Sequence, residues 1–209
     1  MSDIILNRAE GSIQFTTGNT LLSTTRNGTF EFDGNNLYFT IGSVRKRIKI
    51  RDINIGDTFQ GGVVFYITAP VSGATSGTAG LICKTSDMSG TGQWGCYGTK
   101  VSGADGTAIG TGEQNTIDIH NQTCMHTPTA ANYCFNLTAE TYSDWWLPSL
   151  NELGQMQIQK SIIGGFGSYS YWSSSEYNNN DAKYINFNGL TATSLPKNTN
   201  AHVRAIRRF

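Results

Sequence analysis

The chain has 209 residues, 15 basic and 15 acidic residues, and a charged fraction of 14%. An ordinary globular chain has about 25% charged residues, so neutral groups must build much of this surface, and Thr, Ser, Asn and Gly together supply 85 residues. The lack of a basic excess argues against a nucleic-acid-binding protein. The 38% of hydrophobic residues can bury a core, which argues against disorder.

The sequence also gives no sign of a targeting or membrane segment. Its start has no basic region followed by an apolar region, as a signal peptide would. No apolar run approaches the roughly 18 residues that a spanning helix needs, so we expect no membrane insertion. The four cysteines lack the close spacing typical of zinc sites. One disulfide and buried free thiols both remain open for them.

Residues 1–52 are predicted to form short strands joined by tight turns. Apolar and polar residues alternate over 11–18 and 29–33, and residues 37–41 are β-branched or aromatic. Asn-Gly and Asp-Gly pairs between these runs are typical of hairpin turns. A few such strands are only marginally stable alone in water, so we expect them to pack against other copies of the chain.

The segment 45–51 holds five of the 15 basic residues. Ile48 and Ile50 alternate with them, which predicts a strand with one basic face. Such a strand could bind an anionic partner, or it could be a solvated edge strand whose charge prevents aggregation. We favour the second interpretation.

Residues 53–209 are predicted to form an α+β domain with about two helices and short antiparallel strands. Apolar residues at helical spacing indicate a helix over 129–137. Ser149 and Glu152 have the spacing of a capping box, which predicts a helix that ends by Gly164 at the latest. The Gly-rich stretch 85–112 is expected to be mostly loop.

Residues that could act in catalysis form no familiar motif. The sequence has neither the nucleophile elbow of a serine hydrolase nor a phosphate-binding P-loop. His120, Cys124 and His126 lack a matching pair for a metal site, and Asp144 and Glu152 are better explained as structural hydrogen-bonding groups. No EF-hand spacing occurs, although Asp and Asn oxygens leave calcium open. We therefore expect no enzyme activity, no cofactor and no metal site.

Residues 177–181, Tyr-Asn-Asn-Asn-Asp, have the composition of a binding surface. Tyr offers rigid amphipathic contact area, and Asn offers adaptable hydrogen bonds. A plain turn is the alternative, because Asn also favours turns.

Six ordered blocks between residues 56 and 209 resemble the Lcl C-terminal domain family, which has a C-type-lectin-like fold. The blocks are GGVVFY (61–66), QWGCYGT (93–99), GTAIGTG (106–112), YSDWWLPS with NEL (142–153), YWSSSEY (171–177) and VRAIR (203–207). This family is similar to the variable proteins of diversity-generating retroelements and to formylglycine-generating enzymes. The enzyme branch depends on a cysteine pair near the end of the domain. No cysteine follows Cys134, so the resemblance implies a binding domain and no such activity.

In the variable proteins, the ligand surface lies between the Trp-Ser-Ser strand and the final Val-Arg strand. The resemblance therefore implies a ligand surface within 177–199 of this chain. The residues predicted to bind ligand are Tyr177, Asn178, Asn179, Asn180, Lys183, Tyr184, Asn186, Asn188, Thr191, Thr193 and Asn198.

Residues 1–50 resemble the strand-rich ends of phage fibre proteins, particularly in DGNNLYFTIG (33–42) followed by Arg45-Lys46. This resemblance implies that residues 1–52 attach the chain to other virion proteins and trimerise it. With a lectin-like domain over 53–209, this predicts a homotrimeric phage tail fibre or tip protein in the virion. It would bind a host cell-surface receptor, such as a glycan, non-covalently during host adsorption. The alternative is a structural head, neck or tail decoration protein whose lectin-like domain only packs against its neighbours.

Overall fold

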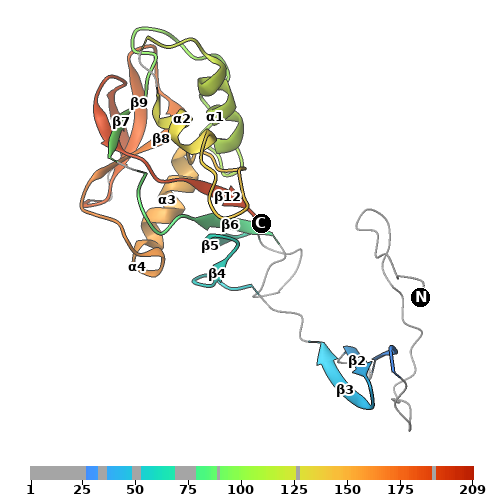
Figure 1. Cartoon of the computed structure of the whole chain (residues 1–209). Coiled ribbons are helices and arrows are strands. Elements are labelled where there is room, and N and C mark those ends of the chain that lie inside the picture. The colour runs from blue at the N-terminus through green and yellow to red at the C-terminus, as the bar shows by residue number, and fades with distance from the viewer. Residues whose placement is uncertain are drawn as a thin grey trace. The chain divides into compact units, whose positions relative to one another are not determined.

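The computed structural model describes residues 27–32, 37–48, 53–68, 79–88, 90–125, 128–189 and 192–209. The chain divides into two compact units, 1–51 and 52–209 (Figure 1). This division falls one residue from the boundary drawn from the sequence. Over the described ranges, every helix is too short or too polar to cross a membrane.

The first unit contains a three-stranded antiparallel sheet in the order β1–β2–β3. Its strands are β1 (Phe30–Phe32), β2 (Leu37–Ile41) and β3 (Val44–Ile48). Gly42 in the β2–β3 turn has a φ of +65°, a conformation that glycine adopts without steric cost. The Gly42 N–H also donates to the side-chain oxygen of Asn27 at 2.7 Å.

These strands match the sequence prediction over the residues that can be compared. The basic segment begins as β3, which lies at one edge of the described sheet. This position agrees with the interpretation of a charged edge strand. The predicted strand at 11–18 and the Asp33-Gly34 turn lie outside the described residues.

The second unit is α+β, with two sheets and four helices in its described part. The larger sheet has the order β10–β9–β8–β11–β7, and the smaller has the order β12–β6–β5–β4. All strand pairs are antiparallel except β8 with β11. The strands are β4 (Thr58–Phe59), β5 (Gly62–Ile67), β6 (Gly80–Cys83), β7 (Thr91–Gln93), β8 (Ser170–Glu176), β9 (Asp181–Asn186), β10 (Ala192–Pro196), β11 (Asn200–His202) and β12 (Ile206–Arg208). The helices are α1 (Gly112–Asn121), α2 (Ala130–Phe135), α3 (Leu150–Ile158) and α4 (Lys160–Ile163).

Two helices begin where the sequence predicts. Thr129 caps α2 and forms a capping box with Asn132. Ser149 caps α3 and forms the predicted capping box with Glu152. These reciprocal hydrogen bonds satisfy N–H groups that have no partner within the first helical turn. Gly164, at a φ of +75°, ends α4 as expected.

The expectation of about two helices was wrong, because α1 and α4 are also present. The sequence hides α1 because the helix buries Asn115 and Thr116 together with Gly112 and Ile119. Asn115 donates to the Gly106 carbonyl at 2.6 Å, and Thr116 donates to the Gly112 carbonyl at 2.7 Å. Buried polar groups with satisfied hydrogen bonds can thus replace the apolar stripe that identifies most helices.

The core of the second unit forms two clusters on the two faces of β8. Consecutive side chains of a strand point to opposite faces, so Trp172 enters one cluster and Tyr171 the other. Helices α1 and α2 contribute to the Trp172 cluster, while α3 and α4 contribute to the Tyr171 cluster. Figure 1 shows α1 and α2 side by side, with α3 separate from them. Strand β8 therefore lies between the two core clusters and contributes side chains to both.

Candidate functional site

The β8–β9 turn is closed by hydrogen bonds of its own. The N–H groups of Tyr177 and Asn178 both donate to the Asp181 carbonyl, at 3.0 and 3.1 Å. The side-chain oxygen of Asn178 accepts the N–H groups of Asn180 and Asp181, at 2.7 and 2.8 Å. Asn178 therefore shapes the turn, as the alternative interpretation of this stretch proposed.

Two further segments, distant in sequence, lie against this turn. The Gly98 N–H donates to the Asn179 carbonyl at 3.0 Å, and the Lys197 N–H donates to the Asn180 carbonyl at 2.8 Å. The exposed residues of the three joined segments include two tyrosines and several asparagines, beside Thr99 and Lys100. We call five of these residues the tyrosine platform: Tyr97, Tyr177, Asn179, Asn180 and Asn198.

The two tyrosines of the platform are well exposed. Tyr97 is 51% exposed and Tyr177 is 60% exposed. The ammonium nitrogen of Lys183 lies 4.7 Å from the centre of the Tyr177 ring, a cation–π geometry that favours one orientation of the ring. The platform thus offers aromatic surface beside neutral hydrogen-bonding groups.

The sequence analysis missed Tyr97, although a local signal marks its loop. Gly95 and Gly98 flank the Cys96-Tyr97 pair with φ angles of +95° and +84°. A Cβ at position 95 would also collide with the Thr129 side chain. Two glycines so close together are typical of a sharp turn that presents the residues between them.

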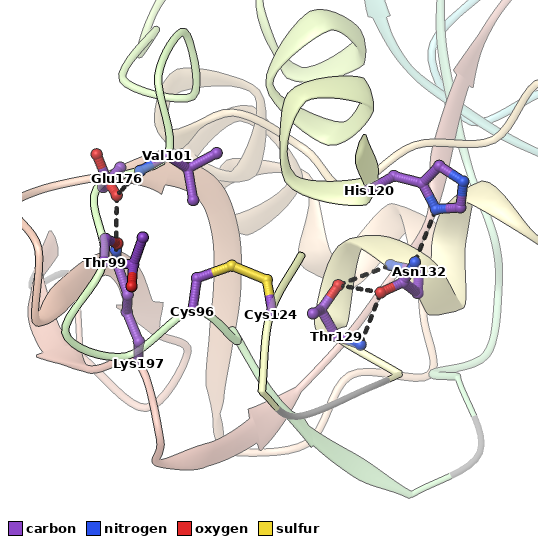
Figure 2. Close-up of a disulfide and its surroundings, with 9 residues drawn as sticks. All are labelled: Cys96, Thr99, Val101, His120, Cys124, Thr129, Asn132, Glu176 and Lys197. Carbon is purple, nitrogen blue, oxygen red and sulfur yellow. Dashed lines mark hydrogen bonds and ion pairs between the residues drawn. A yellow bond between two sulfur atoms is a disulfide. The ribbon is translucent and has the colours of Figure 1, made fainter. Parts of the chain in front are cut away.

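A buried ion pair between Lys197 and Glu176 joins the segments that carry the platform (Figure 2 shows the pair with Thr99 and Val101). Lys197 Nζ lies 2.6 Å from Glu176 Oε1, and the two side chains are 0% and 2% exposed. Glu176 also accepts the Val101 N–H at 2.8 Å, and Lys197 also donates to the Thr99 carbonyl at 2.8 Å. One pair therefore joins the end of β8, the 97–101 loop and the segment after β10.

The surroundings of Lys197 act on its charge in opposite directions. Burial lowers the pKa of Lys197, while the hydrogen bond and the negative charge of Glu176 raise it. The side chain also lies over the Trp94 ring, with Nζ 4.8 Å from the ring centre. A buried ion pair of this kind orients its neighbours strongly, even where it adds little net stability.

A disulfide joins Cys96, next to Tyr97, to Cys124 after α1 (Figure 2). The other two cysteines, Cys83 and Cys134, are buried free thiols. Burial raises the pKa of Cys83 to about 12 and also raises that of Cys134. The protein thus contains one disulfide and also two buried free thiols, the two possibilities that the sequence left open for its cysteines.

Two of the three residues considered for a metal site, His120 and Cys124, have other partners. His120 Nδ1 lies 2.7 Å from the Asn132 amide nitrogen (Figure 2), and its ring stacks on Phe135. Cys124 is held in the disulfide, and His126 lies outside the described residues. Within the described ranges, no group of three or more His, Cys, Asp or Glu side chains is placed to hold a metal ion.

The candidate carboxylates each have a structural partner. Asp144 receives two hydrogen bonds from Arg207, at 2.6 and 2.8 Å, and the bond to Arg207 holds the pKa of Asp144 below its ordinary value. Glu152 accepts the N–H groups of Ser149 and Gly110, both at 2.8 Å. Burial nevertheless raises the pKa of Glu152. These groups hold elements together, as the structural interpretation proposed.

The other residues predicted to bind ligand are distributed over both faces of the larger sheet. Lys183 and Tyr184 are neighbours in β9, so their side chains point to opposite faces. Tyr184 is half-buried and packs edge-on against Trp172, while Thr193 pairs with Tyr184 across the β9–β10 ladder. The Asn186 side chain accepts the Asn188 N–H at 2.8 Å and shapes the next turn. Thr191 lies outside the described residues.

The sequence was also compared with known proteins. No family model matches it, and no curated protein matches it. A proposal for function must therefore come from the geometry of the tyrosine platform together with the resemblance noted in the sequence.

Proposed function

We propose that residues 53–209 bind a neutral host-surface ligand, such as a glycan, non-covalently through the tyrosine platform. In this proposal the chain is a phage fibre or tip protein of the virion, and residues 1–52 attach and trimerise it. The observation that carries the binding proposal is the pair of exposed rings, Tyr97 and Tyr177, on segments joined by the buried Lys197–Glu176 pair. The assignment to a virion depends on the resemblance of the sequence to fibre proteins.

The chemistry of the platform suits a neutral, hydroxyl-rich ligand. Tyrosine rings supply rigid contact area, and asparagine amides both donate and accept hydrogen bonds. A contact surface built from uncharged side chains is little affected by salt screening. Single contacts of this kind are weak, so several copies of the domain in a trimer would raise the overall affinity through avidity.

The C-type-lectin-like fold is part of the same proposal. It is supported by the α+β arrangement of the second unit. The blocks 93–99 and 171–177, on which the resemblance depends, contain Tyr97 and Tyr177. An apolar, shielded surface at 177–199 would favour the alternative of a decoration protein. Residues 177–180 are exposed Tyr and Asn, which favours the binding proposal.

The test compares the full chain with the double variant Tyr97→Ala/Tyr177→Ala on an array of neutral bacterial surface polysaccharides. We expect the wild-type chain to bind at least one polysaccharide, and the double variant to bind it at least about tenfold more weakly, since aromatic anchors dominate such interfaces. The matched control is Tyr169→Ala, which removes another tyrosine that is 52% exposed but lies outside the platform. Equal binding by the wild type and the double variant would contradict the proposal, as would an equal loss in the control.

A further inference from the structure

The Cys96–Cys124 disulfide lies where it can control the platform. Cys96 is 5% exposed and directly precedes Tyr97, whereas Cys124 belongs to the segment after α1. The loop is also held by hydrogen bonds, from the Gly98 N–H to Asn179, from the Val101 N–H to Glu176 and from Lys197 Nζ to the Thr99 carbonyl. Apart from the backbone, the disulfide is the covalent link that joins the Tyr97 loop to the segment after α1.

We infer that this disulfide is a redox lock for the tyrosine platform, so that the platform binds its ligand in the oxidised chain and loses that ability on reduction. This inference rests on the proposed function for its ligand. Its structural part, the ordering of the loop 97–101 by the disulfide, stands independently of any ligand.

Of the four cysteines, only Cys96 and Cys124 should take part in thiol–disulfide exchange. Cys83 and Cys134 are fully buried, and burial keeps both thiols protonated at neutral pH. Cys124 is only partly buried, in contrast to the other three cysteines, so it is the cysteine at which a small thiol or disulfide would start the exchange. Redox changes should therefore open and close the Cys96–Cys124 bond without rearranging the other two cysteines.

The closing step is an exchange with a low-molecular-weight disulfide such as oxidised glutathione. The Cys124 thiolate attacks one sulfur of the small disulfide, releases one small thiolate and forms a mixed disulfide. The Cys96 thiolate then attacks Cys124 Sγ and releases the second small thiolate. Two protein thiols are oxidised to one disulfide, one small disulfide is reduced to two thiols, and the two protons pass to the released thiolates.

The lock would give the protein different states inside and outside a cell. A virion protein is made in a reducing cytosol and acts in oxidising surroundings. The Tyr97 loop would remain loose during assembly and would become ordered after release. Binding of glycan ligands inside the producing cell would thereby be suppressed.

The experiment measures amide hydrogen exchange and polysaccharide binding for the full chain, oxidised and reduced with dithiothreitol. The probes for the loop are the Gly98 and Val101 amides, which donate to Asn179 and Glu176. The reference is the Leu153 amide within α3, which donates to Ser149. On reduction we expect exchange at the loop amides to accelerate at least about tenfold and exchange at Leu153 to stay unchanged. Binding to the polysaccharide array should fall at least about tenfold, and oxidised glutathione should restore both signals.

Variants separate the lock from other effects of reductant. The variant Cys96→Ser/Cys124→Ser should behave as the reduced chain even under oxidising conditions. Cys134→Ala, which removes a buried free thiol, should keep the behaviour of the oxidised chain. If the Cys96→Ser/Cys124→Ser variant exchanged its Gly98 amide hydrogen as slowly as the oxidised wild type, the lock would be overturned.

The outcomes distinguish this inference from the proposed function. Faster loop exchange, with no polysaccharide bound by either form, would support the lock and contradict the proposed ligand. Equal binding and equal exchange in both forms would overturn the lock and leave the proposed function standing. Faster exchange at Leu153 as well would show that the disulfide stabilises the whole unit, and it would overturn a local lock.

Discussion

At the scale of single residues, the Lys197–Glu176 pair should be costly to break. We expect Lys197→Met to lower the free energy of unfolding by about 3–5 kcal/mol, because it leaves the Glu176 carboxylate buried without a cation. Urea denaturation would measure the change. Lys100→Met, at an exposed lysine within the 97–101 loop, serves as the matched control and should cost less than about 0.5 kcal/mol.

Variants of Lys197 and Glu176 should show that the two residues are coupled in their effect on the free energy of unfolding. The double variant Lys197→Met/Glu176→Gln should lose less stability than the sum of its single variants, since neither charge is then left alone. Additive losses would show that the pair does not act as a unit.

The Asp144–Arg207 pair predicts a dependence of stability on acid. The pKa of Asp144 is lowered in the folded state from an ordinary value of 3.8, so the unfolded chain binds the proton more readily. The stabilisation from Asp144 is therefore present above pH 3.8 and is lost as the pH falls below it. Because Asp144 is 53% exposed, the effect should be about 1 kcal/mol or less.

Thermal unfolding from pH 7 to about pH 2 would test this prediction, because the contribution of Asp144 is fully lost only below the lowered pKa of the folded state. Compared with the wild type, Asp144→Asn should be less stable at pH 7, and the two chains should converge in acid. Parallel curves across the whole range would argue against a lowered pKa at Asp144.

The ligand set predicted from the sequence contains four of the five platform residues and lacks Tyr97. The Asn run beside Tyr177 has an unusual composition, and the turn it forms is local, so neighbouring residues were enough to predict it. Tyr97 lies far from Tyr177 in sequence, and the two segments meet through the bond from Gly98 to Asn179. No periodicity or spacing along one chain encodes such a contact between two loops.

At the scale of elements, two glycines in helices should respond in opposite directions to alanine. A Cβ at Gly112 would lie 2.6 Å from the Ser149 backbone nitrogen and would collide with the Glu152 carboxylate. We expect Gly112→Ala to destabilise the domain by about 1–3 kcal/mol. At Gly154 the nearest atom is Ile185 Cδ1 at 3.9 Å, so Gly154→Ala should stabilise α3 by about 0.5–1 kcal/mol.

Urea denaturation of the two variants is the measurement, and each variant is the control for the other. Both remove a glycine from a helix, so any difference between them reports the space around the new methyl group. A stable Gly112→Ala variant would show that α1 does not pack tightly against the start of α3.

The elements that could be predicted were those with local signals. The helices α2 and α3 carry capping boxes, and the strands carry alternating patterns with glycine between them. The helix α1 was missed because Asn115 and Thr116 are satisfied by groups elsewhere in the chain, such as the Ser174 hydroxyl and the Leu147 carbonyl. Sequence patterns detect burial of apolar groups, and here the buried groups are polar.

At the scale of the whole molecule, the division into two units predicts that trimerisation and the folding of the second unit can be separated. The second unit has its own core on both faces of β8, so residues 52–209 should fold without residues 1–51. We expect the full chain to sediment as a trimer and the shortened chain to sediment as a monomer with the same melting temperature. Analytical ultracentrifugation and thermal unfolding would measure this. A shortened chain that remains trimeric would contradict trimerisation by residues 1–52.

The positions of β11 and β12 have a consequence for biosynthesis. Strand β11 lies inside the larger sheet between β8 and β7, while β12 pairs with β6 and its Ile206 also bridges to Trp146. Both sheets therefore stay incomplete until the last strands of the described fold have left the ribosome. Until then, Trp172 and Tyr171 on the two faces of β8 lack some of their packing partners and are open to chaperones or to misassembly.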